Sequence, residues 1–248
     1  MKLFGLIGFP LGHSFSASYF GEKFSNEGIE AVYKNFVLKD IDEFQELVKN
    51  EPDLMGLNVT VPYKEKVIPF LDGLSQTALT IQAVNTICFC RRDNRLALAG
   101  HNTDVIGFER SLKEHMKPNH TSALVLGTGG SSKAIIFVLN ELGIAFKKVS
   151  RSRGEDRISY SELTSGHLKE HSLIINTSPS GMYPDVESYP DIPYNELTPD
   201  HLLFDLVYNP EKTIFLSRGE KMGAAIVNGH DMLHYQAEAS WEIWNRKR

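Results

Sequence analysis

Residues 127–130, Gly-Thr-Gly-Gly, constrain the fold of this chain more than any other feature of the sequence. They follow the short apolar run 123–126 and precede a helical pattern over 131–142. A strand, a glycine turn and a helix in this order open a βαβ unit of a parallel sheet. Gly127 permits the tight turn, and Gly129 lets the backbone approach a pyrophosphate that the start of the helix then holds. The order predicts an α/β fold with a dinucleotide-binding loop.

The predicted second strand of this unit indicates which dinucleotide. The third glycine of the usual fingerprint is replaced by Ser132, so a glycine turn without a ligand remains an alternative. About 20 residues on, where an acidic residue would bind the ribose of NAD, the sequence reads Val-Ser-Arg-Ser-Arg over 149–153. Arginine binds phosphate through a charge-assisted fork, so Arg151 favours the 2′-phosphate of NADP. A solvated basic loop beside Glu155 and Asp156 is the alternative.

Short apolar runs alternate with helical patterns along the whole chain, which is typical of the α/β class. We expect an N-terminal substrate domain at 1–103, completed by a C-terminal helix at 231–248, and a Rossmann-like cofactor domain at 104–230. The polar stretch 117–121 has the composition of a connection between domains. The expected strands are 2–8, 31–38, 55–61, a hairpin of 84–90 with 96–100, then 122–126, 145–150, 173–176, 202–206 and 224–227, and a helix covers 104–116.

Composition excludes several classes of partner. A net charge of -5 gives no basic surface for nucleic acid or an anionic membrane, and no run of about 18 apolar residues could span one. Cys88 and Cys90 are too close in sequence to staple a fold, so we expect reduced packing residues on one face of a strand in a cytoplasmic chain. The N-terminus could pass for a short signal peptide, but its glycines favour a strand and a loop.

The segment N-V-T-V-P-Y-K (58–64) is the first candidate for catalysis. On a strand, Asn58 and Thr60 would face one side together. Pro62 would then end the strand and open a helix, which would set Lys64 at the positive N-terminus of that helix and favour proton transfer near neutral pH. A surface lysine with a solvated head is the alternative.

A second polar segment, G-H-N-T-D (100–104), precedes an apolar helix. Asp104 would be the N-cap of that helix, and it could also pair with Lys64. Late in the chain, His230 and His234 have the spacing of a zinc-protease helix, but the residue after His230 is Asp231, which is too short to serve as the general base. We therefore expect no metal site.

Several motifs in one order resemble the shikimate dehydrogenases, and the resemblance covers nearly the whole chain. Besides the glycine loop, they are G-F-P-L-G-H-S-F-S (8–16), N-V-T-V-P-Y-K (58–64), A-V-N-T (83–86), G-H-N-T-D (100–104), N-T-S-P-S-G-M (176–182), D-L-V-Y-N-P (205–210) and G-H-D-M-L-H-Y-Q (229–236).

The resemblance implies reduction of 3-dehydroshikimate to shikimate with NADPH, in the pathway to chorismate and the aromatic amino acids. Lys64 and Asp104 would assist the proton transfer. The residues implied to bind the substrate are Ser14, Ser16, Asn58, Thr60, Asn85 and Gln236. Those implied to bind NADP are Gly127, Thr128, Gly129, Gly130, Ser131, Ser150, Arg151, Ser152, Thr177, Ser178, Met182, Tyr208 and Gly229.

One departure from the family pattern concerns the substrate loop, where Ala17 stands in place of the usual proline after Ser14 and Ser16. Two other functions stay open: a quinate or shikimate dehydrogenase that uses NAD, and a noncatalytic module that senses NADP or a metabolite. The expected partners are small molecules, with no nucleic acid and no membrane, and the expected assembly is a monomer or a homodimer.

Overall fold

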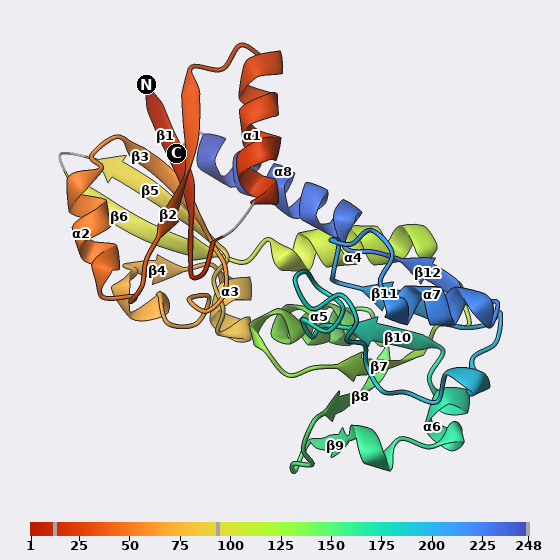
Figure 1. Cartoon of the computed structure of the whole chain (residues 1–248). Coiled ribbons are helices and arrows are strands. Elements are labelled where there is room, and N and C mark those ends of the chain that lie inside the picture. The colour runs from red at the N-terminus through yellow and green to blue at the C-terminus, as the bar shows by residue number, and fades with distance from the viewer. Residues whose placement is uncertain (12–13, 93–94, 247–248) are drawn as a thin grey trace. The chain divides into compact units, whose positions relative to one another are not determined.

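The computed structural model describes residues 1–11, 14–92 and 95–246 (Figure 1). The chain divides into two compact units. The first comprises residues 1–103 together with 236–248, and the second comprises residues 104–235. Each contains one six-stranded sheet with helices, so the predicted α/β class is confirmed. Among the described residues, no helix is both long and apolar enough to cross a membrane.

The sheet of the first unit is mixed, in the order β2-β1-β3-β5-β6-β4. β1 lies parallel to both β2 and β3, while β5 runs antiparallel to β3 and to β6. The elements of this unit are β1 (Lys2–Gly8), α1 (Phe15–Asn26), β2 (Ala31–Val37), α2 (Glu43–Asn50), β3 (Leu54–Val59), the 3-10 helix η1 (Ile68–Phe70), β4 (Gly73–Leu74), α3 (Gln76–Ile81), β5 (Thr86–Arg92), β6 (Arg95–His101) and the C-terminal part of α8 (His230–Asn245).

Two apolar clusters cover the two faces of this first sheet, because successive side chains of a strand point to opposite sides. One cluster packs α2 against the sheet through Phe44 and Leu57. The other packs α1 and α8 against the opposite face, with the rings of Phe24 and Trp241 5.4 Å apart. Figure 1 shows α1 and α2 on opposite sides of this sheet. Gly56 has no room for a side chain, since a Cβ there would lie 2.2 Å from Trp244.

Cys88 and Cys90, which we expected to be packing residues, belong to the second of these clusters. Cys88 is buried and Cys90 is partly buried, and their Sγ atoms lie 3.8 Å apart on one face of β5. The expected packing role is therefore confirmed.

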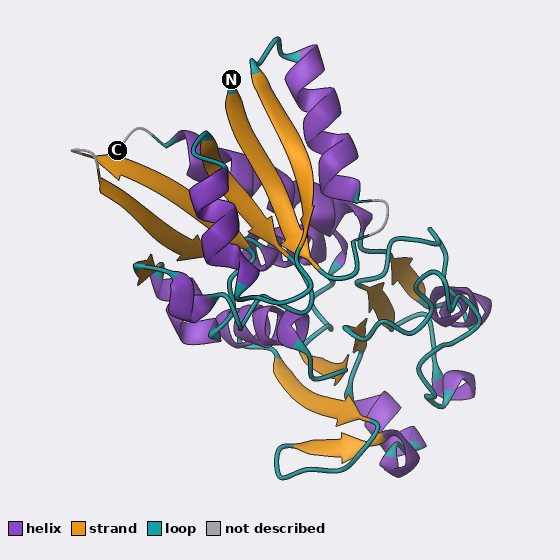
Figure 2. Cartoon of the chain, turned by 60° about the vertical axis from the view of Figure 1, so that its left-hand side comes forward, coloured by secondary structure: helices purple, strands orange, loops and turns teal. Residues whose placement is uncertain are grey.

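The sheet of the second unit is wholly parallel, in the order β12-β11-β10-β7-β8-β9. This is the doubly wound order of dinucleotide-binding domains: successive strands are added toward one edge from β7 to β9 and toward the other edge from β10 to β12, so the strand order reverses between β7 and β10. Figure 2 distinguishes these strands from the helices beside them. The elements are α4 (Asp104–His115), β7 (Ser122–Leu126), α5 (Gly130–Glu141), β8 (Ala145–Ser150), β9 (Arg157–Ser159), η2 (Tyr160–Glu162), α6 (Ser165–Glu170), β10 (Leu173–Asn176), η3 (Tyr194–Glu196), β11 (Leu202–Asp205), α7 (Ile214–Lys221) and β12 (Ala225–Val227).

Three expectations from the sequence need correction. No α-helix begins at Pro62: β3 ends at Val59, Val61 is 64% exposed, and turns lead to η1. Proline has no N–H to continue the ladder, so the strand stops before it. The polar stretch 117–121 does not connect the two units, because it lies within the second unit between α4 and β7. Asp104 is the first residue of α4, one position further into the helix than the predicted N-cap.

Candidate active site

Two of the predicted polar segments of the first unit, those that carry Asn58 and Asn85, meet at one edge of its sheet. β3 ends there, β5 begins there and β6 ends there, because Asn58, Thr86 and His101 are paired across these three strands. Backbone hydrogen bonds extend this edge, with the Val59 N–H donating to the Asn85 carbonyl at 2.8 Å. Antiparallel pairing thus brings the N-V-T and A-V-N-T motifs together.

Asn85 is the centre of a buried polar network at this edge. Its Oδ1 accepts from the backbone N–H of Thr103 at 2.7 Å, and its Nδ2 donates to Thr103 Oγ1 at 3.0 Å. Nδ2 also lies 3.4 Å from Oε1 of Gln236, on α8. All three side chains are at most 7% exposed. The structure therefore brings together Asn85 and Gln236, two of the residues that the resemblance implies for substrate binding.

Asn58 joins the same network from β3. Its Nδ2 donates to Ser240 Oγ at 3.0 Å and to Thr86 Oγ1 at 3.3 Å, and its Oδ1 accepts from the Tyr33 hydroxyl at 2.8 Å. The motifs imply no role for Thr86, Thr103, Ser240 or Tyr33. The period-2 pattern of β2 was the available signal for Tyr33, since it places this residue on the same face as Ala31.

Ser14 and Ser16 lie at the start of α1, within a motif whose residues 12 and 13 fall outside the described residues. Ser14 is the N-cap, and its Oγ accepts from the Ala17 N–H at 3.3 Å. The proline usual at this position in the family has no N–H and could not make this bond. Because Oγ is used as an acceptor, the Ser14 hydroxyl proton remains able to donate to a carboxylate. Ser16 is buried.

Backbone contacts hold the segments that carry Thr60 and Lys64. The Thr60 N–H donates to the Ile7 carbonyl at 2.9 Å, and the Val84 N–H donates to the Lys64 carbonyl at 2.7 Å. Lys64 is partly buried. Its position thus comes from pairing with the segment before Asn85 and not from a helix terminus.

Asp104 directly follows Thr103, whose backbone Asn85 holds, and it is 6% exposed. An acidic group in the first turn of a helix is favoured by the helix dipole, so α4 suits a charged carboxylate at this position.

In the second unit, the predicted glycine loop joins β7 to α5 at the point where the sheet reverses its order. Gly127 has a φ of 118°, and a Cβ there would lie 2.6 Å from Thr177 Oγ1. By contrast, a Cβ at Gly129 would meet nothing within 4 Å. The protein itself therefore requires glycine at 127, whereas at 129 it leaves space that a ligand could use.

The missing third glycine has a structural explanation. Ser132 is buried and donates its hydroxyl to the Gly129 carbonyl at 2.6 Å, so it braces the loop. Gly129 is the N-cap of α5 and has no side chain to bond the amides of the first turn. Those amides and the positive helix end suit an anion. Thr128, Gly130 and Ser131 complete the loop, with Thr128 exposed.

The loop after β8 carries the predicted phosphate-binding residues. Ser150 donates its hydroxyl to the Ser152 carbonyl at 2.6 Å, which folds the loop into a turn. Arg153 is paired with Glu162 at 2.9 Å, whereas Arg151 is exposed and has no hydrogen bond or ion pair with any described residue. Of these two arginines, Arg151 is the one whose charge is available to a ligand phosphate.

Buried polar groups that the sequence analysis missed shape the segment after β10. Asn176 Nδ2 donates to Asp205 Oδ1 at 2.9 Å, while Asn176 Oδ1 accepts from the N–H and hydroxyl of Ser178. Asp205 also accepts from the Thr213 hydroxyl at 2.6 Å and from the Val207 N–H at 3.0 Å. Burial raises the pKa of Asp205 to about 6, against the lowering effect of these three donors.

The remaining predicted cofactor residues lie at the same carboxyl-terminal edge of the second sheet. Thr177 donates its hydroxyl to the Leu126 carbonyl at 3.0 Å, which ties β10 to the end of β7. Met182 is 45% exposed and Tyr208 is partly buried. Gly229 has a packing reason to be glycine, because a Cβ would lie 2.2 Å from the Leu206 carbonyl oxygen.

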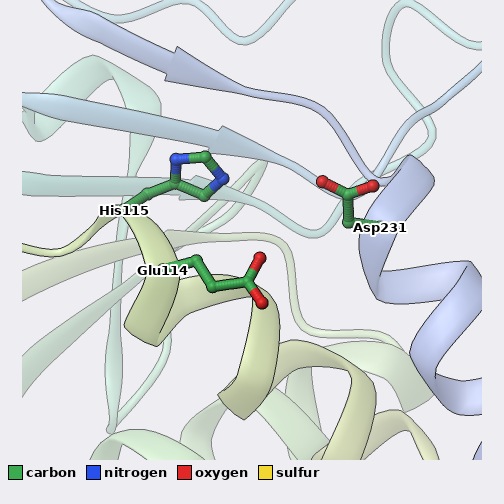
Figure 3. A group of neighbouring side chains, drawn as sticks. All are labelled: Glu114, His115 and Asp231. Atoms are coloured by element: carbon green, nitrogen blue, oxygen red, sulfur yellow. The ribbon is translucent and has the colours of Figure 1, made fainter.

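One group of potential metal ligands occurs among residues 1–11, 14–92 and 95–246, and it is not the pair His230 and His234. Glu114 and His115 at the end of α4 lie near Asp231 at the start of α8, and all three are exposed (Figure 3). Glu114 already accepts from the Tyr235 hydroxyl at 2.8 Å and lies 3.9 Å from Arg110. Glu114 thus already has a hydrogen-bond donor and a positively charged neighbour, and we assign no ion to the group.

A doubly wound parallel sheet with a glycine loop, joined to a second α/β unit with a buried polar edge, defines the class of two-domain pyridine-nucleotide oxidoreductases. Residues 6–87 match the family model described as the shikimate dehydrogenase substrate binding domain. The chain belongs to the shikimate dehydrogenase family.

The similarity to relatives extends over more than 90% of their length. A shikimate dehydrogenase (NADP(+)) of Caldicellulosiruptor saccharolyticus is 37% identical over 98% of this chain and 92% of its own. The crystal structure of shikimate dehydrogenase 1 from Peptoclostridium difficile is 37% identical, with a TM-score of 0.86 over 100% of this chain and 93% of that one. A Thermus thermophilus structure in complex with NADP(H) and shikimate is 28% identical, with a TM-score of 0.86 over 99% and 94%.

Proposed function

We propose that this protein reduces 3-dehydroshikimate to shikimate with NADPH, a step toward chorismate and the aromatic amino acids. The observation that carries the proposal is the buried edge of the first sheet, where Asn58, Asn85 and Gln236 meet. Such an uncharged set of amides and hydroxyls suits the hydroxyl groups of a small polar ring. The relatives named as NADP-dependent shikimate dehydrogenases support the same reaction.

In this proposal, the first unit binds the substrate. Ser14 and Ser16 donate hydroxyl protons to the substrate carboxylate, and the N-cap bond of Ser14 supports this role because it leaves the Ser14 proton available. The side chains that bond the substrate hydroxyls are Asn58, Thr60, Asn85 and Gln236. The proposed domain limits are 1–103 with the helix 231–248, and 104–230.

Lys64 and Asp104 assist the proton transfer in this proposal. In the reduction, the ketone oxygen gains a proton as its carbon gains a hydride, so the reaction requires a positioned proton donor, and the Lys64 ammonium group is the donor in this proposal. The Asp104 carboxylate stabilises that ammonium and orients it. Support comes from the backbone bonds that fix the segments carrying both residues.

The second unit binds the cofactor in this proposal, and NADPH when bound supplies the hydride. Its residues fit the group: the open space at Gly129 admits a pyrophosphate, and the uncompensated charge of Arg151 suits the 2′-phosphate. The other residues proposed to contact it are Gly127, Thr128, Gly130, Ser131, Ser150, Ser152, Thr177, Ser178, Met182, Tyr208 and Gly229. We propose that the protein works in the cytoplasm, as a monomer or a homodimer.

The test is steady-state turnover, followed by absorbance at the nicotinamide band, with shikimate or quinate as the acid and NADP+ or NAD+ as the cofactor. We expect turnover with shikimate and NADP+ to exceed that of the other three combinations. Turnover confined to quinate and NAD+ would indicate a quinate dehydrogenase. Binding of NADP+ without turnover of either acid would indicate a sensing module.

A further inference from the structure

Tyr33 hydrogen-bonds with Asn58 and with Ser16, two residues of the proposed substrate site. It lies outside every sequence motif. It lies on β2, with its ring stacked on Phe20 at a centroid distance of 4.8 Å and an interplanar angle of 15°. Its hydroxyl donates to Asn58 Oδ1 at 2.8 Å. Burial raises the pKa of Tyr33 far above its ordinary value, and a hydrogen bond with Ser16 lowers it less. The hydroxyl is therefore protonated at neutral pH and acts as a donor.

The surroundings of Asn58 fix which end of its amide faces Tyr33. Nδ2 lies 3.3 Å from the carbonyl oxygen of Asn85, and a carbonyl can only accept. If the amide were flipped, two carbonyl oxygens would face each other at that distance and the Tyr33 hydroxyl would face an N–H. The backbone of Asn85 thus sets one end of the amide, and the hydroxyl of Tyr33 sets the other.

This orientation determines what Asn58 can offer to a ligand. The two protons on Nδ2 are shared among three acceptors, the Asn85 carbonyl, Thr86 Oγ1 and Ser240 Oγ. Oδ1 has two lone pairs, and Tyr33 uses one of them. The group left for a ligand is one acceptor, which requires a donor such as a hydroxyl.

We propose that Tyr33 is a positioning residue that presents Asn58 as an acceptor, and so makes the first unit select acids that carry a ring hydroxyl at that point. The inference rests on the proposed function, because it needs Asn58 to contact the substrate. A ligand with fluorine or hydrogen in place of that hydroxyl leaves the Asn58 lone pair unpaired in a buried site, which is costly.

The test is Tyr33→Phe, which keeps the ring stacked on Phe20 and removes only the hydroxyl. With shikimate and NADP+, we expect KM for shikimate to rise about tenfold, the loss typical of one buried hydrogen bond, while kcat and KM for NADP+ stay within about twofold. The variant should also discriminate less than the wild type against shikimate analogues that lack one of the two hydroxyls not oxidised, because its Asn58 amide is then held only at the Nδ2 end.

The matched control is Tyr194→Phe, which removes a comparable bond from a tyrosine hydroxyl to the Pro190 carbonyl in the second unit. It should lower the unfolding midpoint without changing KM for shikimate. A Tyr33→Phe enzyme with unchanged KM and unchanged discrimination would overturn the inference and leave the proposed function standing. The wild-type protein offers a second test, with shikimate analogues that carry fluorine in place of one of the two hydroxyls not oxidised. If neither analogue bound more weakly than shikimate, the inference would also fail. Absence of wild-type turnover would instead overturn the proposed function.

Discussion

The two polar edges of the molecule are built in opposite ways. In the first unit, Asn58, Asn85 and Gln236 are at most 7% exposed, and they hydrogen-bond to one another and to buried hydroxyls. In the second unit, Thr128, Gly129 and Arg151 are exposed, and a glycine loop, a helix terminus and one arginine take the place of a network. A preformed network of amides and hydroxyls suits the ring hydroxyls of a small substrate, because its donors and acceptors are fixed in place. An open loop with a helix terminus and a positive charge suits phosphates. Substitutions at the two edges should therefore have separable effects.

The largest effect should come from Lys64→Ala, which removes the proposed proton donor from the first edge. We expect kcat to fall by about two to four orders of magnitude, as for a positioned general acid, with KM for NADP+ little changed. Lys66→Ala, two residues on and exposed, is the matched control and should behave as wild type. An unimpaired Lys64→Ala enzyme would remove this residue from the mechanism.

Arg151→Ala should act on the second edge alone. Loss of the arginine should raise KM for NADP+ about 10- to 100-fold and leave KM for NAD+ and for shikimate unchanged, because only NADP+ carries the 2′-phosphate. Arg153→Ala serves as control, since Glu162 already pairs with Arg153. Equal losses with NADP+ and NAD+ would contradict a role in reading the phosphate.

The two glycines of the loop sharpen the comparison, because one serves the fold and the other the ligand. Gly127→Ala places a Cβ 2.6 Å from Thr177 Oγ1 at a φ of 118°, so it should cost about 2 kcal/mol of stability. Gly129→Ala meets no atom within 4 Å and should keep the unfolding midpoint while raising KM for NADP+ about tenfold. Chemical denaturation and steady-state kinetics of both variants check this. A Gly129→Ala enzyme with wild-type affinity would mean that no ligand approaches there.

A smaller effect should appear in the pH dependence of stability. The folded-state pKa of Asp205, about 6, lies above its ordinary value, so the folded state takes up a proton as the pH falls. Its contribution is present at low pH and is lost as the pH rises through 6. Between pH 7.5 and pH 5 it should add about 1.4 kcal/mol to the free energy of unfolding.

His120 and His171 act in the opposite sense, because burial lowers the pKa of both and their contribution is lost as the pH falls. The measurement is therefore the difference between the wild type and Asp205→Asn in urea denaturation at the two pH values. If the free energy of unfolding changed between the two pH values by the same amount in Asp205→Asn as in the wild type, Asp205 would not titrate in this range.

How much of this molecule the sequence could predict depended on whether the pattern was local. β1, β7, β8 and β10 were predicted with their observed bounds, because each is a short apolar run next to glycine or polar residues. The helix expected at Pro62 was wrong, since pairing with the segment before Asn85 decides the path of that chain. β4 and β9 were missed, because strands of two or three residues exist only through distant partners.

The candidate site divides in the same way. The motifs identified Asn58, Asn85 and Gln236, and the structure brings these three together. Tyr33 and Ser240 complete the network from other elements and carry no motif, so only tertiary packing could identify them. Asn176 and Asp205 lay inside quoted motifs, yet sequence could not reveal that they bond to each other.

The most direct test of the account is a crystal structure with NADP+ and shikimate both bound. We expect the pyrophosphate over Gly129 at the start of α5, the 2′-phosphate beside Arg151, and shikimate hydroxyls bonded to Asn58 and Asn85. A structure in which the dinucleotide lies away from the glycine loop, or shikimate lies away from the buried edge of the first sheet, would contradict it.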